Sequence, residues 1–371
     1  MNNNKVLGIC NLHNAPSLGG LTQRRSYGSV TMLGRYALMD FTLSNFSNSG
    51  IDSVVTLVPD FPNSIHNHIR SGATWTANMK TGFQYISHND APNLSKLHNT
   101  DINNVLSNII FFKSNSFDTV IMAPAHYLSS MDFRPIIEAH NKSKHDCTVV
   151  YIDVYDGTKS FSKGTIINLN EDGTVRNFRN NTQRNNEIKI SLDTFVMSKD
   201  LFFKIIKEAP NVNEMFTFQK MIAFLNSEKE ISIGTYKFEH YVTPITSLTE
   251  YMNNSFDLLK YENRRKLFRN GWPIYTTTHD TPPAKYGKNA NTKDCIISNG
   301  CRIDGKVEHS ILSRNVVVEK GCTVSNSIIF TDSIITNKSK VNYVITEKNA
   351  HIDTNCCGEQ DEPLFVKHKH N

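Results

Sequence analysis

Short apolar runs rich in β-branched residues alternate with amphipathic runs along the first 154 residues. Turn-forming residues bound the apolar runs, as is typical of strands buried on both faces, at 5–10, 52–58, 118–124 and 146–154. Apolar residues at helical spacing separate these runs at 36–49, 101–113 and 132–144. The alternation predicts an α/β domain with a parallel sheet and helices on both faces of it.

The pattern becomes more varied after this region. A hairpin is expected over 164–178, where NEDG forms the turn, and a strand over 230–238. Helices are expected at 199–208, 214–226 and 247–268. The segment 271–287 contains three prolines and has no periodicity, so we interpret it as a linker.

An internal repeat follows the linker. The strings VEHSIL, VSNSII and VNYVIT begin at Val307, Val324 and Val341, so the repeat length is 324 − 307 = 341 − 324 = 17 residues. Aliphatic residues also recur six positions apart, as in Val318 and Val324. Three strands of about six residues per coil are typical of a triangular parallel β-helix, with one aliphatic residue of each strand pointing inward. A β-sandwich with accidental spacing is the alternative, and three matching units favour the β-helix.

Composition and charge exclude several classes of protein. No stretch approaches the roughly 20 apolar residues of a membrane span, so we expect no membrane segment. The net charge of +5 is spread along the chain without a Lys/Arg block interleaved with aromatic residues, so we expect no nucleic-acid surface. The seven cysteines form no CxxC pair, which argues against zinc ligation and disulfides and predicts a cytoplasmic protein.

Several strings resemble those of the ADP-glucose pyrophosphorylase (glucose-1-phosphate adenylyltransferase) family. LTQRR at 21–25 is similar to its LTxxR motif. The region 34–51, which contains DFTLSN and NSGI, is similar to its GG[KR]YRLIDFxLSNxxNSGI motif. FDLL at 256–259 resembles the end of its connecting helix, and PPAKY at 282–286 resembles its linker. The resemblance covers nearly the whole chain and is specific when these strings are taken together with the repeat.

This resemblance implies both a fold and a chemistry. The implied fold is a Rossmann-like nucleotidyltransferase (GT-A-like) domain with a mixed sheet, followed by a left-handed parallel β-helix. We expect a nucleotidyltransferase domain at 1–245, a connecting helix and Pro-rich linker at 246–290, the β-helix at 291–355 and a tail at 356–371. The family makes ADP-glucose and pyrophosphate from ATP and glucose-1-phosphate, using a Gly-rich loop, basic residues and Mg²⁺ held by two aspartates.

The residues that carry this chemistry in the family are replaced in this chain. The lysine after the Gly-rich loop aligns with Tyr27, and the sugar-phosphate lysine aligns with Asn181. The two aspartates align with Ala125 and Pro244, whose side chains offer no oxygen to Mg²⁺. The loop keeps only a displaced Gly pair at 19–20, which makes phosphate binding doubtful. We therefore expect a degenerate site without catalytic residues or a bound metal.

The replacements are similar to those of the GlgD-type branch, whose members act as regulatory subunits. The resemblance implies a subunit that modulates a catalytic partner within a hetero-oligomer, which the resemblance indicates is a heterotetramer. Mg²⁺ is then expected only in the catalytic partner. A small anionic effector is a further possible partner, because Arg35 falls where the family places a cation for effectors. An ordinary solvated arginine is the alternative. Two other hypotheses are an active adenylyltransferase with a rearranged site, for which Asp132 is the candidate carboxylate, and a sugar-nucleotide-binding scaffold protein.

Some polar residues remain near the degenerate site that the resemblance implies. Arg25, Ser191 and Asp193 are candidates for a residual sugar-phosphate or nucleotide site. The alternative is that such residues cap helices and satisfy turns, and we favour it for Asp101 and His126. The sequence leaves both possibilities open for Ser191 and Asp193.

Overall fold

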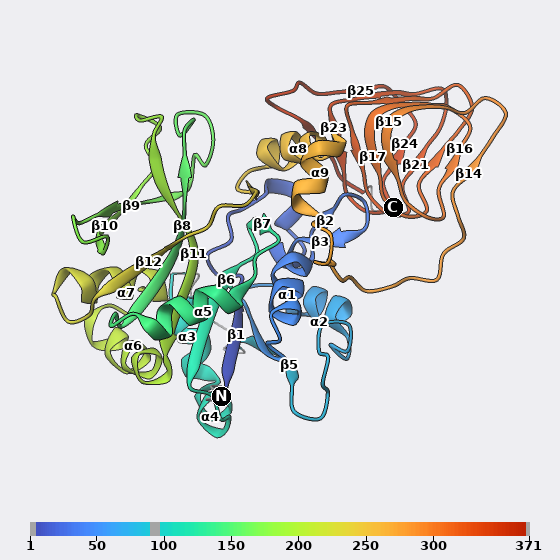
Figure 1. The fold of residues 1–371 in the computed structure, drawn as a ribbon. Coiled ribbons are helices and arrows are strands. Elements are labelled where there is room, and N and C mark those ends of the chain that lie inside the picture. Colours follow the sequence, from blue (N-terminus) through green and yellow to red (C-terminus); the bar gives the residue numbers. More distant parts are fainter. Residues whose placement is uncertain (1–4, 90–96, 369–371) are drawn as a thin grey trace. The chain divides into compact units, whose positions relative to one another are not determined.

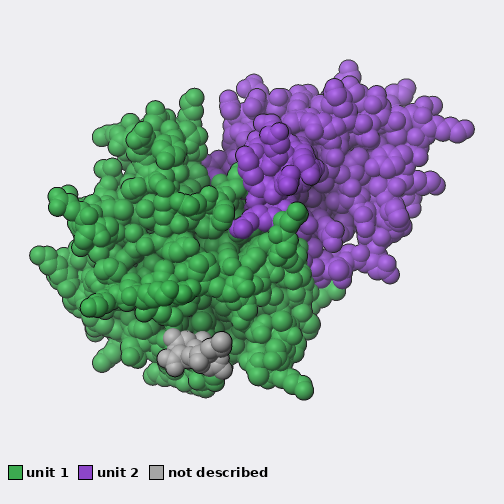
Figure 2. Space-filling model, in the orientation of Figure 1, with its two compact units in different colours: residues 1–15, 41–242, 270–275 green, residues 16–40, 243–269, 276–371 purple. Residues whose placement is uncertain are grey.

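The computed structural model describes residues 5–89 and 97–368, and the last three residues of the predicted tail lie outside this range. The chain forms two compact units (Figure 2): unit 1 holds residues 1–15, 41–242 and 270–275, and unit 2 holds residues 16–40, 243–269 and 276–371. It therefore passes between them five times, at 15/16, 40/41, 242/243, 269/270 and 275/276. In the described ranges, no helix has both the length and the apolar character needed to cross a bilayer.

Within the described residues, unit 1 is built around a nine-stranded sheet (Figure 1). Its main path has the order β10-β9-β11-β6-β1-β4-β5, and β8 pairs with both β11 and β12. The strands are β1 (Val6–Asn11), β4 (Ser53–Val58), β5 (Phe83–His88), β6 (Thr119–Pro124), β8 (Cys147–Val154), β9 (Thr165–Leu169), β10 (Val175–Asn180), β11 (Ile188–Ser198) and β12 (Ile233–Lys237). The strands and the hairpin predicted from the sequence are confirmed, and β5 and β11 are additional.

The sheet is mixed, as the family resemblance implies. β1 pairs in parallel with β4 and β6, β4 pairs in parallel with β5, and β8 does so with β12. β11 runs antiparallel to β6, β8 and β9. The parallel sheet inferred from strand and helix alternation is therefore wrong for β11. This strand follows the β9–β10 hairpin, and no crossover helix precedes it to restore the parallel direction.

Helices cover both faces of this sheet, as predicted. On one face, α3 (Asp101–Ser107), α4 (Ile109–Ser114), α6 (Lys199–Val212) and α7 (Phe218–Ser227) share a core with Leu7 and Ile9 of β1. Gly8 points to the opposite face, because strand neighbours alternate. There it lies against Phe46 of α1 (Leu38–Asn48), whose ring centroid is 4.9 Å from that of Phe133 in α5 (Phe133–Lys142). The remaining elements of the unit are α2 (Pro62–Ile69) and β7 (Tyr127–Ser129).

Several predicted helices differ in extent from those observed, and the helix predicted over 199–208 continues to Val212. The helix expected over 101–113 is interrupted at Asn108, whose amide donates to the backbone carbonyls of Asn104 and His88. An asparagine that bonds the backbone in this way competes with helical hydrogen bonds. The helix expected from residue 214 begins only at Phe218, because Thr217 caps it by accepting a hydrogen bond from the Lys220 amide.

The non-repeat part of unit 2 contains short elements: η1 (Gly19–Thr22), η2 (Tyr27–Ser29), β2 (Thr31–Met32), β3 (Tyr36–Ala37), α8 (Leu248–Asp257) and α9 (Tyr261–Leu267), with β13 (Val242–Pro244) at its boundary. The single helix predicted over 247–268 is thus divided in two. Asp257 explains the break, because its carboxylate accepts hydrogen bonds from Lys260 and Asn263 and so stabilises a turn.

The C-terminal part of unit 2 is a left-handed parallel β-helix, as the resemblance implies. Its strands are β14 (Lys285–Tyr286), β15 (Asn291–Ile297), β16 (Arg302–Ile303), β17 (Lys306–Leu312), β18 (Val317–Val318), β19 (Thr323–Ser325), β20 (Ile328–Ile329), β21 (Ile334–Ile335), β22 (Lys340–Asn342), β23 (Val344–Thr346), β24 (His351–Ile352), β25 (Cys356–Cys357) and β26 (Leu364–Val366). Val307 pairs with Val324 and Val324 pairs with Val341, so the 17-residue repeat is confirmed. Inward residues such as Val318 and Ile335 form its core.

Most strands of the β-helix are shorter than the predicted six residues. The coil bends sharply at columns of residues in the left-handed conformation, such as Asn315, Asp332 and Asn349 with φ of 59°, 60° and 58°. Asn and Asp adopt this conformation more readily than other non-glycine residues. Asn315 Nδ2 also donates to Asp332 Oδ1 of the next coil at 2.9 Å. These turn residues take up positions that the hexad pattern assigns to strands.

Candidate functional site

In unit 1, the position that the resemblance assigns to the first metal-binding aspartate follows β6. Ala125 comes directly after Pro124 and is fully buried. Its neighbour His126 is 4% exposed, and His126 Nε2 lies 3.4 Å from Asp193 Oδ2. His126 Nδ1 is buried without a hydrogen-bond partner among the residues that the structure describes. The structure thus brings His126 and Asp193 together beside an apolar residue.

Asp193 is held at a bulge in β11. The register between β11 and β8 shifts between Ser191 and Thr194, and Asp193 has φ of 48°. Asp193 Oδ1 accepts hydrogen bonds from Gln219 Nε2 at 2.9 Å and from Ser191 Oγ at 3.2 Å. Both oxygens of this carboxylate therefore have protein partners. The arrangement favours a structural role for Ser191 and Asp193 over binding of a ligand.

Asn181, which the resemblance assigns to the position of the sugar-phosphate lysine, holds a neighbouring loop. Its Nδ2 donates to the carbonyls of Gly157 and Phe161 at 2.9 and 3.0 Å. Its Oδ1 accepts from the backbone amide of Gln183 at 2.8 Å. Because the side chain is buried and both amide hydrogens are used, Asn181 has no donor left for a phosphate.

A buried polar network surrounds the end of β1. Asp101, the first residue of α3 as predicted, accepts hydrogen bonds from Asn11 Nδ2 at 2.7 Å and from the Phe218 amide at 3.0 Å. Burial raises the pKa of Asp101 to about 6, against the effect of these hydrogen bonds. His13 Nε2 lies 2.9 Å from Asn104 Nδ2, and burial lowers the pKa of His13 to about 4. The sequence does not predict this network, because its members are far apart along the chain.

In unit 2, Tyr27 and Pro244 are built into local structure. The Tyr27 hydroxyl is buried and donates to the carbonyl of Ile245 at 2.6 Å. The Pro244 carbonyl accepts from Asn254 Nδ2 at 2.5 Å. The remaining glycine pair starts η1, where a Cβ on Gly20 would lie 2.2 Å from the Phe365 ring. Close packing against Phe365 therefore explains the glycine at position 20, and phosphate binding is not needed to explain it.

Four basic residues, Arg25, Arg35, Arg314 and Lys348, form a cationic group in unit 2. One terminal nitrogen of Arg25, Nη1, is buried and has no hydrogen-bond partner within 5–89 and 97–368. Burial lowers the pKa of Arg25, while the nearby Glu347 opposes this. The pKa of Lys348 is lowered mainly by burial and secondly by the positive charge of Arg25. The pKa of Arg314 is lowered mainly by burial and secondly by the positive charge of Arg35. Lys348 therefore lies near Arg25 and Arg314, and Arg314 lies near Arg35, with the carboxylates of Asp40, Asp332 and Glu347 also close to members of the group.

Only two members of this group, Arg25 and Arg35, were predicted from the sequence as candidate binding residues. Arg35 is exposed, and its guanidinium lies 5.8 Å from the centre of the Tyr36 ring. Arg314 and Lys348 were missed, although 348 − 314 = 34 residues is twice the repeat length. The repeat therefore contains a signal for stacked basic side chains in alternate coils. The predicted site residues as a whole fall into both units, with Ala125, Asn181, Ser191 and Asp193 in unit 1 and Arg25, Tyr27, Arg35 and Pro244 in unit 2.

Comparison with protein families adds a direct finding. Residues 17–247, more than half of the chain, match the model described as nucleotidyl transferase. The chain belongs to the nucleotidyl transferase family. Residues 282–362 also match the model described as GlmU-like, C-terminal hexapeptide, in agreement with the observed β-helix.

The chain is similar to curated enzymes over most of its length. It is 28% identical over 325 residues to the glucose-1-phosphate adenylyltransferase of Clostridioides difficile (strain 630), covering 85% of this chain and 82% of that protein. It is 27% identical over 311 residues to the enzyme of the same name from Bacillus subtilis (strain 168), covering 83% and 81%. These relatives support the resemblance to the glucose-1-phosphate adenylyltransferase family.

The Mg²⁺ site implied by that resemblance does not fit the residues of this chain. Ala125 and Pro244 contribute no side-chain oxygen, whereas Mg²⁺ requires a shell of oxygen ligands. The carboxylate of Asp193 is already bonded to Gln219 and Ser191 and lies beside His126. Among the residues described, no group of three or more His, Cys, Asp or Glu side chains is placed to hold a metal.

Proposed function

We propose that this chain is a non-catalytic or weakly catalytic regulatory subunit of glucose-1-phosphate adenylyltransferase, modulating ADP-glucose synthesis for glycogen. The observation that carries the proposal is that the two positions which the resemblance assigns to the metal-binding aspartates are Ala125 and Pro244. Nucleotidyl transfer between two phosphate groups needs cations at the developing charge, and these positions cannot anchor a divalent cation. The hydrogen bonds of Tyr27 and Asn181 support the proposal, because both positions now serve local structure.

A rearranged active site is less well supported. Its candidate carboxylate, Asp132, caps α5 by accepting a hydrogen bond from the Arg134 amide. The same carboxylate pairs with the Arg134 guanidinium at 2.7 Å. Asp132 is therefore occupied at the start of a helix and supplies no free ligand for a metal.

The cationic group supports regulation by a small anion. A buried guanidinium nitrogen without a partner is costly, and an anion bound beside Arg25 would satisfy it. An anion that binds the hetero-oligomer more tightly in one activity state shifts the population toward that state. The catalytic partner then shows a changed apparent affinity for its substrates, although this chain performs no chemistry.

Three preparations test the proposal: this chain, the catalytic subunit of the same organism, and the two co-expressed. Pyrophosphate release from ATP and glucose-1-phosphate is measured with and without added phosphate or sugar phosphates. We expect this chain alone to be inactive, the chains to co-purify, and the kinetics of the partner to change. Turnover by this chain alone at the rate of the catalytic subunit contradicts the proposal, and two chains that never co-purify favour a separate scaffold protein.

The effector role has its own pair of variants. Arg25→Gln should abolish the response to the anion while leaving co-purification intact. Arg302→Gln, which changes an exposed arginine of the β-helix outside the cationic group, should leave the response unchanged. Equal loss of response in both variants would show that the effect depends on overall charge and not on the site.

A further inference from the structure

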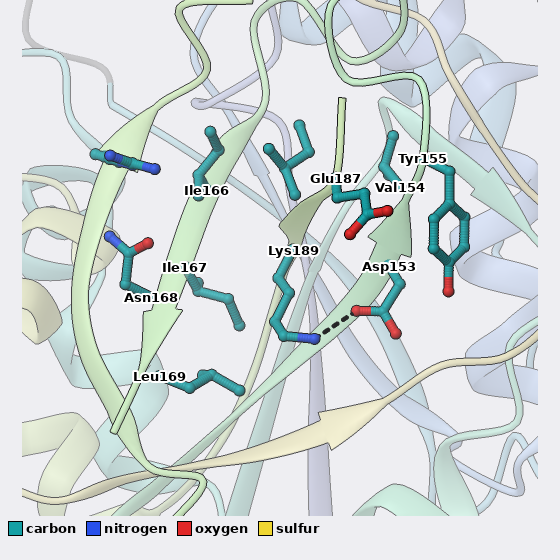
Figure 3. A pocket seen from close by; sticks show the side chains of 11 residues that line it. Asp153, Val154, Tyr155, Ile166, Ile167, Asn168, Leu169, Glu187 and Lys189 are labelled. Carbon is teal, nitrogen blue, oxygen red and sulfur yellow. Dashed lines mark hydrogen bonds and ion pairs between the residues drawn. The ribbon is translucent and has the colours of Figure 1, made fainter. Parts of the chain in front are cut away.

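The strands β9 and β11 of unit 1 separate after a short stretch of pairing. They pair only at Ile190 with Ile166 and at Ser191 with Thr165. Beyond this point β9 continues along β10, and β11 continues along β8 as far as Ile188. A cavity of about 410 Å³ opens where they diverge, lined on the two sides by residues 166–169 and 187–189 (Figure 3). We call this opening the strand slot.

The strand slot is bordered by two strand edges without a partner. In the part of the chain that the structure describes, neither 167–169 nor 187–189 forms a ladder across the opening. Backbone N–H and C=O groups at such an edge are strong hydrogen-bonding groups that an added strand can satisfy. An extended peptide matches this row of alternating donors and acceptors, which is the basis of strand addition in peptide recognition.

Charged side chains of opposite sign lie on the two sides of the strand slot. Arg179 of β10 and Glu187 beside β11 are exposed, line the cavity and have no ion-pair partner in the described ranges. In contrast, Lys189 is held by Asp153, with Nζ 2.6 Å from Oδ1, as Figure 3 shows. Asp153 also pairs with Lys237 of β12 at 2.9 Å. One cation and one anion thus remain available, from opposite sides of the opening.

The two charges come from the two sides of the opening. Arg179 lies on β10 and pairs with Ile166 of β9, on one side. Glu187 lies in the bend directly before β11, on the other side. A strand in the opening would lie between Arg179 and Glu187, both of which line the cavity.

We propose that the strand slot receives an extended segment of the catalytic partner, with an acidic residue facing Arg179 and a basic residue facing Glu187. The choice of partner rests on the proposed function. Buried Ile166 and Ile188 line the same cavity and suit an apolar residue beside the charged ones.

Hydrogen exchange of backbone amides tests the occupant directly. Exchange is compared for this chain alone and for its complex with the catalytic subunit. We expect amides in 167–169 and 187–189 to become at least about tenfold more protected in the complex, as strand pairing requires. A complex that forms without this protection overturns the inference and leaves the proposed function standing. Absence of any complex overturns both.

Charge reversal tests the roles of Arg179 and Glu187 in the strand slot. Arg179→Glu and Glu187→Lys should each weaken the complex by about tenfold, or about 1.4 kcal/mol. The matched controls are Arg176→Glu, exposed on the same strand β10, and Glu171→Lys, exposed in the hairpin turn, and both lie outside the cavity. Equal effects of variants and controls would overturn the assignment. Protection of the same amides in this chain alone, rising with its concentration, would show that a second copy is the occupant.

Discussion

Two residues in unit 1, the buried Asp101 and the partly buried His13, respond to pH in opposite ways. Burial raises the pKa of Asp101 from 3.8 to about 6, so its stabilising contribution is complete below pH 3.8 and is lost as the pH rises to 6. Burial lowers the pKa of His13 from 6.5 to about 4, so its contribution is complete above pH 6.5 and is lost as the pH falls to 4. Each of these changes in pKa corresponds to about 3 kcal/mol.

We therefore expect the contributions of Asp101 and His13 to the free energy of unfolding, measured in urea, to nearly cancel between pH 4 and 6.5 in the native chain. His13→Gln should lose up to about 3 kcal/mol as the pH rises through this window, and Asp101→Asn should lose a similar amount as it falls. Asp60→Asn, which changes an exposed aspartate, should follow the native chain. The same slope in both buried-site variants would contradict the explanation.

Restoring the family lysine at Asn181 should harm the protein without creating activity. Asn181→Lys removes the donors to Gly157 and Phe161 and buries a charge, so we expect a loss of at least about 2 kcal/mol in unfolding free energy. Asn180→Lys changes the exposed neighbour and should cost less than about 0.5 kcal/mol. Urea unfolding and pyrophosphate release measure the two effects. A stable, active Asn181→Lys variant would show that the hydrogen bonds of Asn181 are unimportant.

The replacements at single positions could be identified from the sequence, but their partners could not. Ala125 and Pro244 are visible because they interrupt strings that resemble a known family. The bond between Gln219 and Asp193 depends on how α7 packs near the bulge of β11, and no local pattern encodes that contact. The same holds for Asn11 and Asp101, which are 90 residues apart in the chain.

The β-helix offers a matched comparison within a single strand. In β21, Ile335 is 0% exposed in the core, whereas its neighbour Ile334 points outward and is 40% exposed. Ile335→Ala should cost about 2–5 kcal/mol, because a cavity remains where the side chain was. Ile334→Ala removes the same carbons and should cost less than about 1 kcal/mol. Thermal and urea unfolding check both variants, and equal costs would contradict the assigned inward and outward faces.

Elements with a strong period were predictable, whereas interruptions of a period were not. The repeat gives the β-helix its register because an inward aliphatic residue recurs every 17 positions at Val307, Val324 and Val341. The breaks at Asn108 and Asp257 depend on single side-chain hydrogen bonds that leave the apolar spacing intact. β11 was missed because its length and direction depend on its partners β6 and β8.

The compact units of the whole molecule do not follow the order of the chain. The sequence predicts consecutive segments ending at 245, 290 and 355, whereas unit 2 combines residues 16–40 and 243–269 with the β-helix. Within unit 2, Ser298 Oγ donates to the Gly34 carbonyl at 3.1 Å. The ring of Phe256 in α8 lies 4.8 Å from that of His309. Early segments of the chain thus have their packing partners in the C-terminal coils.

It follows that a fragment ending before the β-helix should be unstable, although it contains the whole matched nucleotidyl transferase region, 17–247. Residues 1–281 lack Phe330, whose ring lies 6.4 Å from Tyr251, and Phe365, against which Gly20 packs. Loss of several kcal/mol should lower the midpoint of thermal unfolding by more than about 10 °C. A fragment of residues 1–368 is the control and should unfold like the full chain. If residues 1–281 unfolded cooperatively at the temperature of the full chain, the contacts between distant segments of unit 2 would contribute little, and the linear order of domains would be the better description.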